Sequence, residues 1–365
     1  MTALPEQLQS ALDTALRRFP QQELARAVTR LITRYRQGEA ATTPILVTPV
    51  DAAAYAGYRM PGTYAAVRSA LTEIARQLPD FAPRSLIDVG GGTGTAVWAA
   101  TETWPSLAEL TVVEQAPEVV ALGRRLMAES PRLRGTAWQR GRIDPAAEAP
   151  RADVVTLSYV LGELPEAVRA ATVRWLGQSA GLLVLIEPGT PAGYERILRA
   201  RDELIGAGRD VVAPCPHQRA CPIPAGEDWC HFSARLPRVG AHRVIKEGSL
   251  NFEDEKFSYV AVVGAGVAGV GGGEAGGVGA GGREAAGGVV SGGAGAGGAG
   301  VVVGRAANRV LRHPVKRKGL VALRLCTGAD GLAEVTVTKR HGVDYRAARD
   351  VEWGEEWAPS MPDRD

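Results

Sequence analysis

Asp88-Val-Gly-Gly-Gly-Thr-Gly94 is the stretch that decides the predicted fold of this 365-residue chain. The loop directly follows a short apolar run at 85–89 and precedes a helical pattern at 95–103. A buried parallel strand that ends in glycines and leads into a helix is typical of nucleotide-binding α/β sheets. Glycines let the backbone pass close to a ligand and adopt positive φ angles. The loop therefore predicts a cofactor site at the end of the first strand.

Strands and helices alternate along the chain beyond this loop. Further strands are expected at 110–114, 152–158 and 181–187, and further helices at 117–129, 165–178 and 192–207. This alternation is typical of a doubly wound α/β sheet. We therefore expect a Rossmann-like class I methyltransferase sheet.

The segments before and after this α/β region in the sequence have different patterns. Amphipathic helical patterns at 6–37 and 63–78 predict an N-terminal helical cap, and the Pro/Gly segment 54–62 between them predicts a loop. Strand patterns at 256–262, 320–325 and 333–338, the last two joined by a turn predicted at 328–331, indicate a small β-rich C-terminal unit. Residues 262–304 are mostly Gly, Ala and Val, too poor in large side chains to bury a core, so a flexible insert is expected. The predicted divisions are 1–80, 81–208, 209–261, 262–304 and 305–365.

The residues of the loop indicate which cofactor it binds. Asp88 begins the loop, where its carboxylate can address a ligand amino group, and Glu114 ends the next strand, where it can hold ribose hydroxyls. An acid at the loop's start favours S-adenosylmethionine (SAM) over a nicotinamide dinucleotide. A dinucleotide oxidoreductase and a glycine turn without ligand are the alternatives. We expect Gly90, Gly92 and Gly94 to contact the cofactor.

Two further polar residues are candidates for the same pocket. Asp144 falls where a third strand, between those at 110–114 and 152–158, is expected to end, and it can face the adenine or simply cap a turn. Ser158 ends the fourth strand, at the usual mouth of a ligand site in an open sheet. No base–nucleophile pair is visible there. The sequence thus predicts cofactor binding and favours a SAM-dependent methyltransferase. It assigns no catalytic residues.

All four cysteines of the chain are candidate metal ligands: Cys215, Cys221, Cys230 and Cys326. Four thiolates complete a tetrahedral zinc site or ligate an iron–sulfur cluster. The spacing fits neither a short zinc finger nor a bacterial ferredoxin run, so it leaves zinc, a cluster and buried structural thiols open. His217 and His231 are possible substitute ligands.

The composition fits a soluble globular protein, with 45% hydrophobic and 22% charged residues. The chain's start has no secretory signal pattern and no run of about 18 apolar residues is present. We therefore expect no membrane association and a cytoplasmic location by default, where disulfides are rare.

Several motifs together resemble a known family of small-subunit ribosomal assembly factors, whose mitochondrial members are called Rsm22 or methyltransferase-like protein seventeen. The resemblance covers most of the chain. It rests on Tyr58-Arg-Met-Pro-Gly-Thr-Tyr, the Asp88–Gly94 loop, Ser158-Tyr-Val-Leu-Gly-Glu-Leu, Cys215-Pro-His-x3-Cys-Pro, Asp228-Trp-Cys-His-Phe, Lys256-Phe-Ser-Tyr, Pro314-Val-Lys-Arg-Lys-Gly, Leu325-Cys-Thr, Thr338-Lys and Glu352-Trp-Gly. The cysteine block is the most specific of these motifs.

The resemblance implies a [4Fe–4S] cluster on the four cysteines and association with the small ribosomal subunit and its rRNA. A basic stretch with Arg312, His313, Lys316, Arg317 and Lys318 is then a candidate contact for rRNA phosphates, the alternative being a solvated surface. Three hypotheses follow: an rRNA methyltransferase, a non-catalytic assembly factor, and a small-molecule methyltransferase with a structural zinc.

Overall fold

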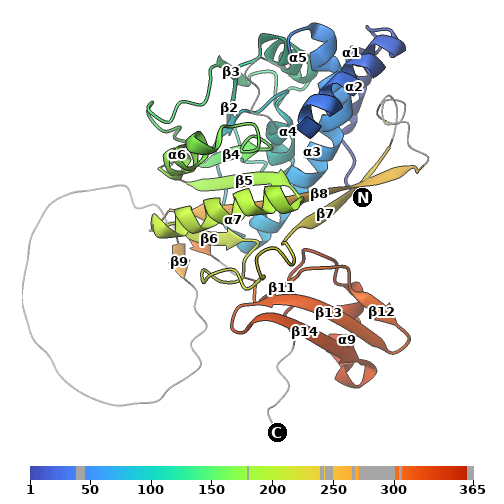
Figure 1. The fold of residues 1–365 in the computed structure, drawn as a ribbon, viewed down its shortest axis with the longest axis vertical. Coiled ribbons are helices and arrows are strands. Elements are labelled where there is room, and N and C mark those ends of the chain that lie inside the picture. Colours follow the sequence, from blue (N-terminus) through green and yellow to red (C-terminus); the bar gives the residue numbers. More distant parts are fainter. Residues whose placement is uncertain are drawn as a thin grey trace, which may run out of the picture.

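The computed structural model describes residues 1–37, 46–178, 181–238, 242, 250–264, 268–270, 301–303 and 306–359. Figure 1 shows a large α/β unit and a smaller β-rich unit formed by the C-terminal part of the chain. Within the described residues, no helix combines the length and hydropathy that crossing a membrane requires.

A mixed sheet forms the centre of the large unit. Its strands are β1 (Ser85–Val89), β2 (Glu109–Glu114), β3 (Ala137–Arg140), β4 (Val154–Ser158), β5 (Leu182–Pro188), β6 (Asp210–Ala213), β7 (Phe232–Pro237) and β8 (Phe252–Val263). They lie in the order β3-β2-β1-β4-β5-β8-β6, and β7 also pairs with β8. The first five of these are mutually parallel, and β8 is antiparallel to β5. The predicted Rossmann-like sheet is therefore confirmed.

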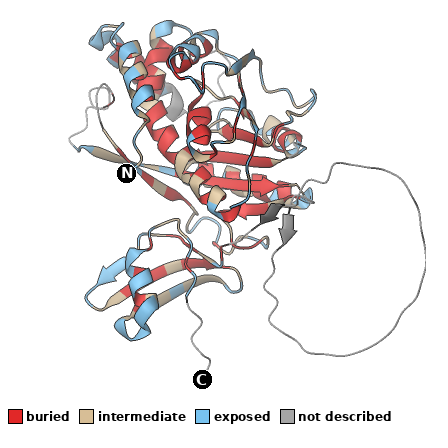
Figure 2. Ribbon diagram, turned by 180° about the vertical axis from the view of Figure 1, so that it is seen from behind, coloured by how far each residue is buried: buried red, intermediate tan, exposed pale blue. Residues whose placement is uncertain are grey.

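Helices cover both faces of this sheet. They are α1 (Glu6–Leu16), α2 (Gln21–Gln37), α3 (Pro49–Gln77), α4 (Thr95–Thr103), α5 (Pro117–Met127), α6 (Glu166–Gly177) and α7 (Pro191–Gly206). One buried apolar cluster joins α1 to α5 with one face of the sheet, and a second joins α6 and α7 with the other face. Figure 2 shows the buried residues concentrated along the strands and the inner sides of these helices. The core thus has the three layers of a doubly wound fold.

The segment 54–62, predicted to be a loop, lies instead inside the long helix α3. The prediction was wrong because the tertiary surroundings outweigh the helix-breaking tendency of Pro61 and Gly62. Both residues are buried, and a Cβ at Gly62 would lie 2.9 Å from a carboxylate oxygen of Glu255 on β8. Glycine therefore permits a close approach of α3 to the sheet at this point.

The strand pattern at 256–262 was also assigned to the wrong unit. It belongs to β8, whose residues 257–263 pair with β5 in the main sheet. Its apolar side chains are buried from Phe257 to Val263. A run that is apolar on both faces fits an interior strand covered on both sides rather than a small C-terminal sheet.

The C-terminal unit is a four-stranded antiparallel sheet that carries one helix. It contains β11 (Asn308–Val310), β12 (Val315–Arg317), β13 (Leu320–Thr327), β14 (Gly331–Thr338), the short helix η1 (Lys339–His341) and α9 (Gly342–Asp350). The strands predicted at 320–325 and 333–338 and the turn between them match β13 and β14. A separate apolar cluster, including Tyr345 and Trp357, forms the core of this unit.

Two short strands, β9 (Ala268–Val270) and β10 (Val301–Val303), pair in parallel at the two ends of the Gly/Ala-rich insert. Most of the insert for which flexibility was predicted, residues 271–300, lies outside the described residues.

Candidate functional site

The glycine loop connects β1 to α4 with three residues in left-handed conformations. Gly90, Gly92 and Gly94 have φ angles of 63°, 57° and 81°, which favour glycine because it has no Cβ. The amides of Gly90 and Gly91 donate to the carbonyl of Val113 on β2, at 2.8 and 3.2 Å. A Cβ at Gly92 would meet nothing closer than the ring and hydroxyl of Tyr55 at 3.7 Å, so the loop has an open side there.

Asp88 lies beneath this loop rather than on its open side. Its side chain is buried, and its Oδ1 accepts a hydrogen bond from the Thr156 hydroxyl on β4 at 2.7 Å. A Cβ at Gly91 would lie 2.5 Å from Asp88 Oδ2, so the carboxyl group supports the loop from below. Burial, with a smaller effect of the charge on Glu114, raises the pKa of Asp88 to about 7.

This raised pKa predicts a pH-dependent stability. Because the ordinary value is 3.8, the folded protein binds one more proton than the unfolded chain between these two values, and stability falls as pH rises through that window. We expect the free energy of unfolding of Asp88→Asn to rise by about 2–3 kcal/mol relative to that of the wild type as the pH is raised from about 5 to about 8. Urea denaturation at several pH values measures this difference. Asp144→Asn, at an exposed position, is the control, and the same pH trend in both variants would contradict the assignment.

Glu114 is held against the glycine loop by two backbone amides. Its Oε2 accepts from Gly92 N at 3.1 Å, and its Oε1 accepts from Ala116 N at 2.8 Å. The fold therefore brings Glu114 to the loop that follows Asp88, although Gly92 and Glu114 are 22 residues apart in the sequence. Charge-assisted hydrogen bonds of this kind fix the carboxylate in one orientation.

The other two candidates for this pocket have different surroundings. Asp144 is exposed, and its Oδ1 accepts from the amide of Ala146 at 3.0 Å, which is a turn-capping contact. Ser158 ends β4, and its hydroxyl is buried without a hydrogen-bond partner among the described residues. Of the two, only Ser158 therefore has a buried polar group that a ligand could satisfy.

Sequence reasoning missed Tyr55, which reaches the loop from α3. Its ring and hydroxyl are the nearest atoms to the open side of Gly92. The residue was overlooked because the segment was interpreted as a loop. Thr48-Pro49-Val50-Asp51 held the missing signal: Thr48 and Asp51 form a capping box, with Pro49 at the first helical position.

Tyr159, directly after β4, has a strained backbone. Its φ of 62° is in the left-handed region, which is uncommon for a tyrosine. Its hydroxyl donates to Glu255 Oε1 at 3.0 Å, and the Arg59 guanidinium lies 5.2 Å from its ring centroid. This network joins α3, the end of β4 and β8 at the edge of the sheet where parallel α/β folds bind ligands.

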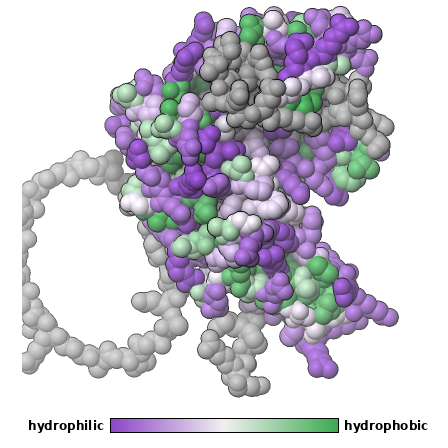
Figure 3. All heavy atoms as spheres, in the orientation of Figure 1, coloured by the Kyte–Doolittle hydropathy of each residue, from purple (hydrophilic) through white to green (hydrophobic). Residues whose placement is uncertain are grey.

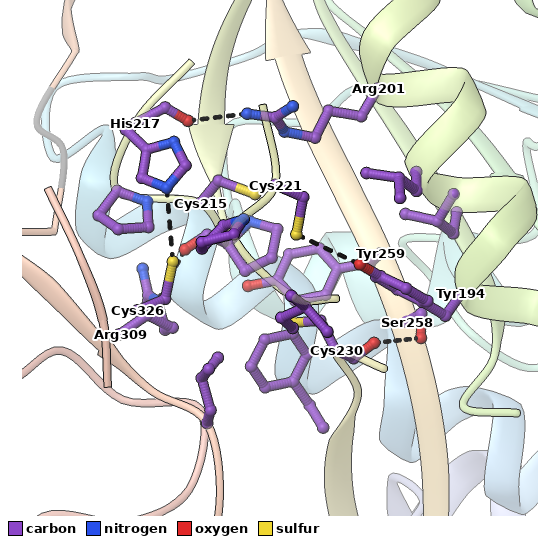
Figure 4. Close-up of a pocket in the computed structure, with 18 residues that line it drawn as sticks. Tyr194, Arg201, Cys215, His217, Cys221, Cys230, Ser258, Tyr259, Arg309 and Cys326 are labelled. Carbon is purple, nitrogen blue, oxygen red and sulfur yellow. Dashed lines mark hydrogen bonds between the residues drawn. The ribbon is translucent and has the colours of Figure 1, made fainter. Parts of the chain in front are cut away.

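The four cysteines, three within 16 residues of the chain and Cys326 a further 96 residues along, line one cavity of about 40 Å³ (Figure 4). Cys215 and Cys221 lie in the loop after β6, Cys230 precedes β7, and Cys326 comes from β13 of the C-terminal unit. The cavity is larger than the ~10–15 Å³ that one water needs. Among the described residues, no three His, Cys, Asp or Glu side chains are grouped as ligands of a single metal ion. The cysteines thus surround a shared space without closing on one point.

Burial disfavours the thiolate form of three of these cysteines. Desolvation raises the pKa of Cys215 and Cys230, and it raises that of Cys326 to about 12. Tyr194 Oη lies 3.2 Å from Cys221 Sγ, and His217 Nε2 lies 3.6 Å from Cys326 Sγ. His231 has a different role: its ring stacks on Trp229 and its Nδ1 contacts the Trp229 carbonyl at 3.1 Å.

Among the described residues that line the cavity, the charged ones are two arginines, and none is an Asp or Glu. The side chains of Arg201 on α7 and Arg309 on β11 are only 3% and 1% exposed. Arg201 Nε and Arg309 Nη2 are buried and have no oxygen or nitrogen acceptor among the described residues. A buried donor without an acceptor is costly, so these groups point to an anionic group in the cavity.

Arg309 also fastens the C-terminal unit to the large unit. It forms an ion pair with Glu73 on α3 and donates to the carbonyls of Pro214 at 2.9 Å and Gly354 at 2.8 Å. Glu73 also accepts from Gln77 at 2.9 Å. The cysteine cavity therefore lies at the junction of α3, the cysteine loop and the C-terminal unit.

The sheet order, the glycine loop at the end of β1 and the acid at the end of β2 together define a class I methyltransferase-like protein. The chain belongs to the Rsm22 family, because the family model described as "Mitochondrial small ribosomal subunit Rsm22" matches residues 49–358. The resemblance inferred from the motifs is thereby confirmed.

Named relatives agree with this membership. The human protein "Ribosome assembly protein METTL17, mitochondrial" is 36% identical over 186 residues, which are 46% of this chain and 40% of that protein. The Schizosaccharomyces pombe "Rsm22-cox11 tandem protein 2, mitochondrial" is 24% identical over 341 residues, covering 85% of this chain and 43% of that protein. The chain thus spans about two fifths of the length of these relatives.

Solved methyltransferases are similar over part of the chain. An O-methyltransferase family protein from Burkholderia thailandensis has a TM-score of 0.38 at 14% identity, covering 60% of each chain. Magnesium protoporphyrin IX methyltransferase from Synechocystis has a TM-score of 0.37 at 13% identity, covering 64% of this chain and 90% of that one.

The predicted cytoplasmic location is contradicted by the relatives. The family and its human and fission yeast relatives are all described as mitochondrial. The prediction was wrong because the two features it used, a missing secretory signal pattern and a missing membrane span, do not distinguish the cytoplasm from the interior of an organelle.

Proposed function

We propose that this chain binds SAM and a [4Fe–4S] cluster and acts in assembly of the small ribosomal subunit. The observation that carries the proposal is the convergence of four cysteines from both units on one cavity whose wall has two buried arginines and no acid. The family membership and the name of the human relative, a ribosome assembly protein, support the ribosomal setting.

The lining of the cavity offers four cysteines, which is the ligand number of both a [4Fe–4S] cluster and a tetrahedral zinc ion. Zinc with bonds of about 2.3 Å to sulfur draws four thiolates into one tight tetrahedron, whereas a cluster of eight atoms keeps them farther apart. Arg201 Nε and Arg309 Nη2, which have no oxygen or nitrogen acceptor among the described residues, suit a net negative occupant, and the resemblance to the family is what favours the cluster over zinc. When bound, a cluster supplies four iron–thiolate bonds that link Cys326 covalently to the large unit.

Metal analysis is the direct test of this assignment. We expect anaerobically purified protein to be brown and to contain iron and acid-labile sulfide in equal amounts, about four of each per chain. A colourless protein with about one equivalent of zinc would overturn the cluster and favour a structural zinc.

The cofactor proposal rests on the glycine loop and Glu114. The open side of Gly92 leaves room for a ligand, Glu114 is fixed beside it, and Tyr55 faces the same space. In this arrangement the loop glycines and the Ser158 hydroxyl bind the amino acid part of SAM, and Glu114 binds the ribose.

Replacing Glu114 tests cofactor binding. We expect Glu114→Gln to weaken binding of S-adenosylhomocysteine by about 10- to 100-fold, because a charged acceptor is replaced by a neutral one. Isothermal titration calorimetry measures the affinity. Glu129→Gln, at an exposed position after α5, is the matched control. Equal affinities for both variants would rule out the ribose contact.

Contact with rRNA is proposed for the outer edge of the C-terminal unit. Lys316, Arg317 and Lys318 are exposed, and the fold places Lys339 and Arg340 beside them, since Lys339 N donates to the Gly319 carbonyl at 3.2 Å. Figure 3 shows hydrophilic side chains gathered at this end of the unit, where Figure 1 places β12. Arg312, which sequence reasoning grouped with them, instead pairs with Asp228.

Charge reversal tests this surface. We expect Lys316→Glu/Lys318→Glu to weaken binding to small-subunit rRNA by about 10- to 100-fold. The slope of log binding constant against log salt concentration should become smaller by about two, one for each lost phosphate contact. Filter binding at several salt concentrations measures both quantities. The control is Arg124→Glu/Arg125→Glu on the exposed side of α5. A loss of the same size in the control would show that only overall charge matters.

Methyl transfer to rRNA is a second proposed activity, favoured by the strained backbone of Tyr159 at the acceptor side of the sheet. Strained residues of this kind concentrate at functional sites. Incubation of small-subunit particles with radiolabelled SAM tests it. If the protein binds the cofactor but transfers no methyl group, catalysis is rejected and the assembly role still stands.

A further inference from the structure

Arg201 lies on the cavity wall and donates hydrogen bonds to the backbone of the loop that carries two of the cysteines. Its Nη2 donates to the carbonyls of His217 at 3.1 Å and Arg219 at 2.7 Å, which belong to the loop between Cys215 and Cys221. Figure 4 shows the guanidinium beside Cys215 and His217, reached from α7. The arginine thus holds the backbone of the loop that carries two of the cysteines.

The positive charge of Arg201 lacks a buried counter-charge. Among the described residues its carboxylate contact is Asp202 at 2.8 Å, whose side chain is 58% exposed and therefore screened by water. Arg309 differs, because its partner Glu73 is itself 8% exposed. Of the two cationic side chains on the wall, Arg201 therefore supplies the net positive charge.

A buried guanidinium without a buried anion is unfavourable, because nothing compensates the loss of its hydration. The described residues of the wall include no Asp or Glu to compensate it, and its four thiols are the groups that become anionic when they ligate a metal. Four thiolates around a cluster with two positive charges carry a net charge of about −2. The missing counter-charge of Arg201 is then the occupied cysteine site itself.

We infer that Arg201 is a positioning residue of the cysteine site, which compensates the negative charge of the bound group and holds the Cys215–Cys221 loop around it. This role rests on the proposed cluster. Two effects follow from the two contacts. The charge favours the reduced, more negative state and so raises the reduction potential, and the hydrogen bonds to His217 and Arg219 slow the opening of the loop.

The experiment compares reconstituted wild type with Arg201→Gln, Arg201→Lys and Arg199→Gln. Arg199 is on the same helix but is 64% exposed and pairs with Glu195 and Glu166, so it is the matched control. A redox titration followed by electron paramagnetic resonance gives the midpoint potential. Release of iron to a chelator gives the rate of cluster loss.

For Arg201→Gln we expect about a tenfold shift of the one-electron equilibrium towards the oxidised state, which is 59 mV, and cluster loss about tenfold faster. Arg201→Lys keeps the charge but not the planar fork, so its potential should stay near the wild type while its cluster is lost faster. Arg199→Gln should match the wild type in both measurements.

Three results would overturn the inference. A potential and loss rate for Arg201→Gln equal to those of Arg199→Gln remove the role while leaving the cluster in place. A fall in potential of equal size in the lysine variant shows that geometry, and not charge, is responsible. Wild-type protein that takes up no iron and sulfide refutes the proposed cluster and this role with it. Because the lysine variant keeps the buried charge, it remains informative if Arg201→Gln does not fold.

Discussion

Glu73→Gln is expected to lower the free energy of unfolding by about 3–5 kcal/mol, because it leaves the Arg309 guanidinium buried without its anion. The side chains of Glu73 and Arg309 are 8% and 1% exposed, so water cannot replace the lost partner. Arginine stays charged at any ordinary pH and cannot escape the penalty by losing its proton. Urea denaturation followed by tryptophan fluorescence measures the change.

Arg76→Gln is the matched control for this prediction. Arg76 lies one turn from Glu73 and contacts the same carboxylate at 3.4 Å, but its side chain is 57% exposed. An exposed pair is worth about 0–1 kcal/mol, so this variant should remain close to the wild type. The double variant Glu73→Leu/Arg309→Met removes both charges and should regain part of the lost stability. Equal losses for Glu73→Gln and Arg76→Gln would contradict the role of the buried pair.

The second large effect is expected from Cys326→Ser, which removes the cysteine contributed by the C-terminal unit. We expect this variant to lose about nine tenths or more of its bound iron, because metal binding and ordering of a site built from distant segments are coupled. The C-terminal unit should then be cut by protease faster, since one of its links to the large unit is gone. Iron analysis and limited proteolysis measure the two effects.

Ser258→Ala separates ligand loss from a general disturbance of the cavity. Ser258 lines the same cavity and donates to the carbonyl of Cys230 at 2.8 Å, but it carries no thiol. This control should keep its iron and its resistance to protease. Full iron content in Cys326→Ser would exclude Cys326 as a ligand, and rapid proteolysis of both variants would attribute the effect to packing.

Local patterns in the sequence were sufficient where neighbouring residues fix the structure. The apolar runs, the glycine loop and the acid after the second strand lie within about thirty residues, and each gave a correct prediction of β1, α4 or β2. The hairpin of β13 and β14 was also predicted from its strands and turn. In these elements, local preference and tertiary packing favour the same structure.

Distant contacts decided the elements that the sequence misassigned. Segment 54–62 contains Pro61 and Gly62, and its burial between the glycine loop and β8 outweighs their helix-breaking tendency. The apolar run of the strand 252–263 fits an interior strand but does not identify its neighbour, and its pairing with β5 is a long-range contact. A one-dimensional pattern does not contain such contacts.

The sequence by itself determined the α/β fold class, the glycine loop with Glu114 and the family, because these depend on residue types at short, fixed spacings. The tertiary structure alone decided that Asp88 lies under the loop, that Tyr55 lies over it, and that Arg201 faces the cysteines. Burial and charge pairing depend on which segments fold against each other, and that is set by the packing of the whole chain rather than by spacing along it.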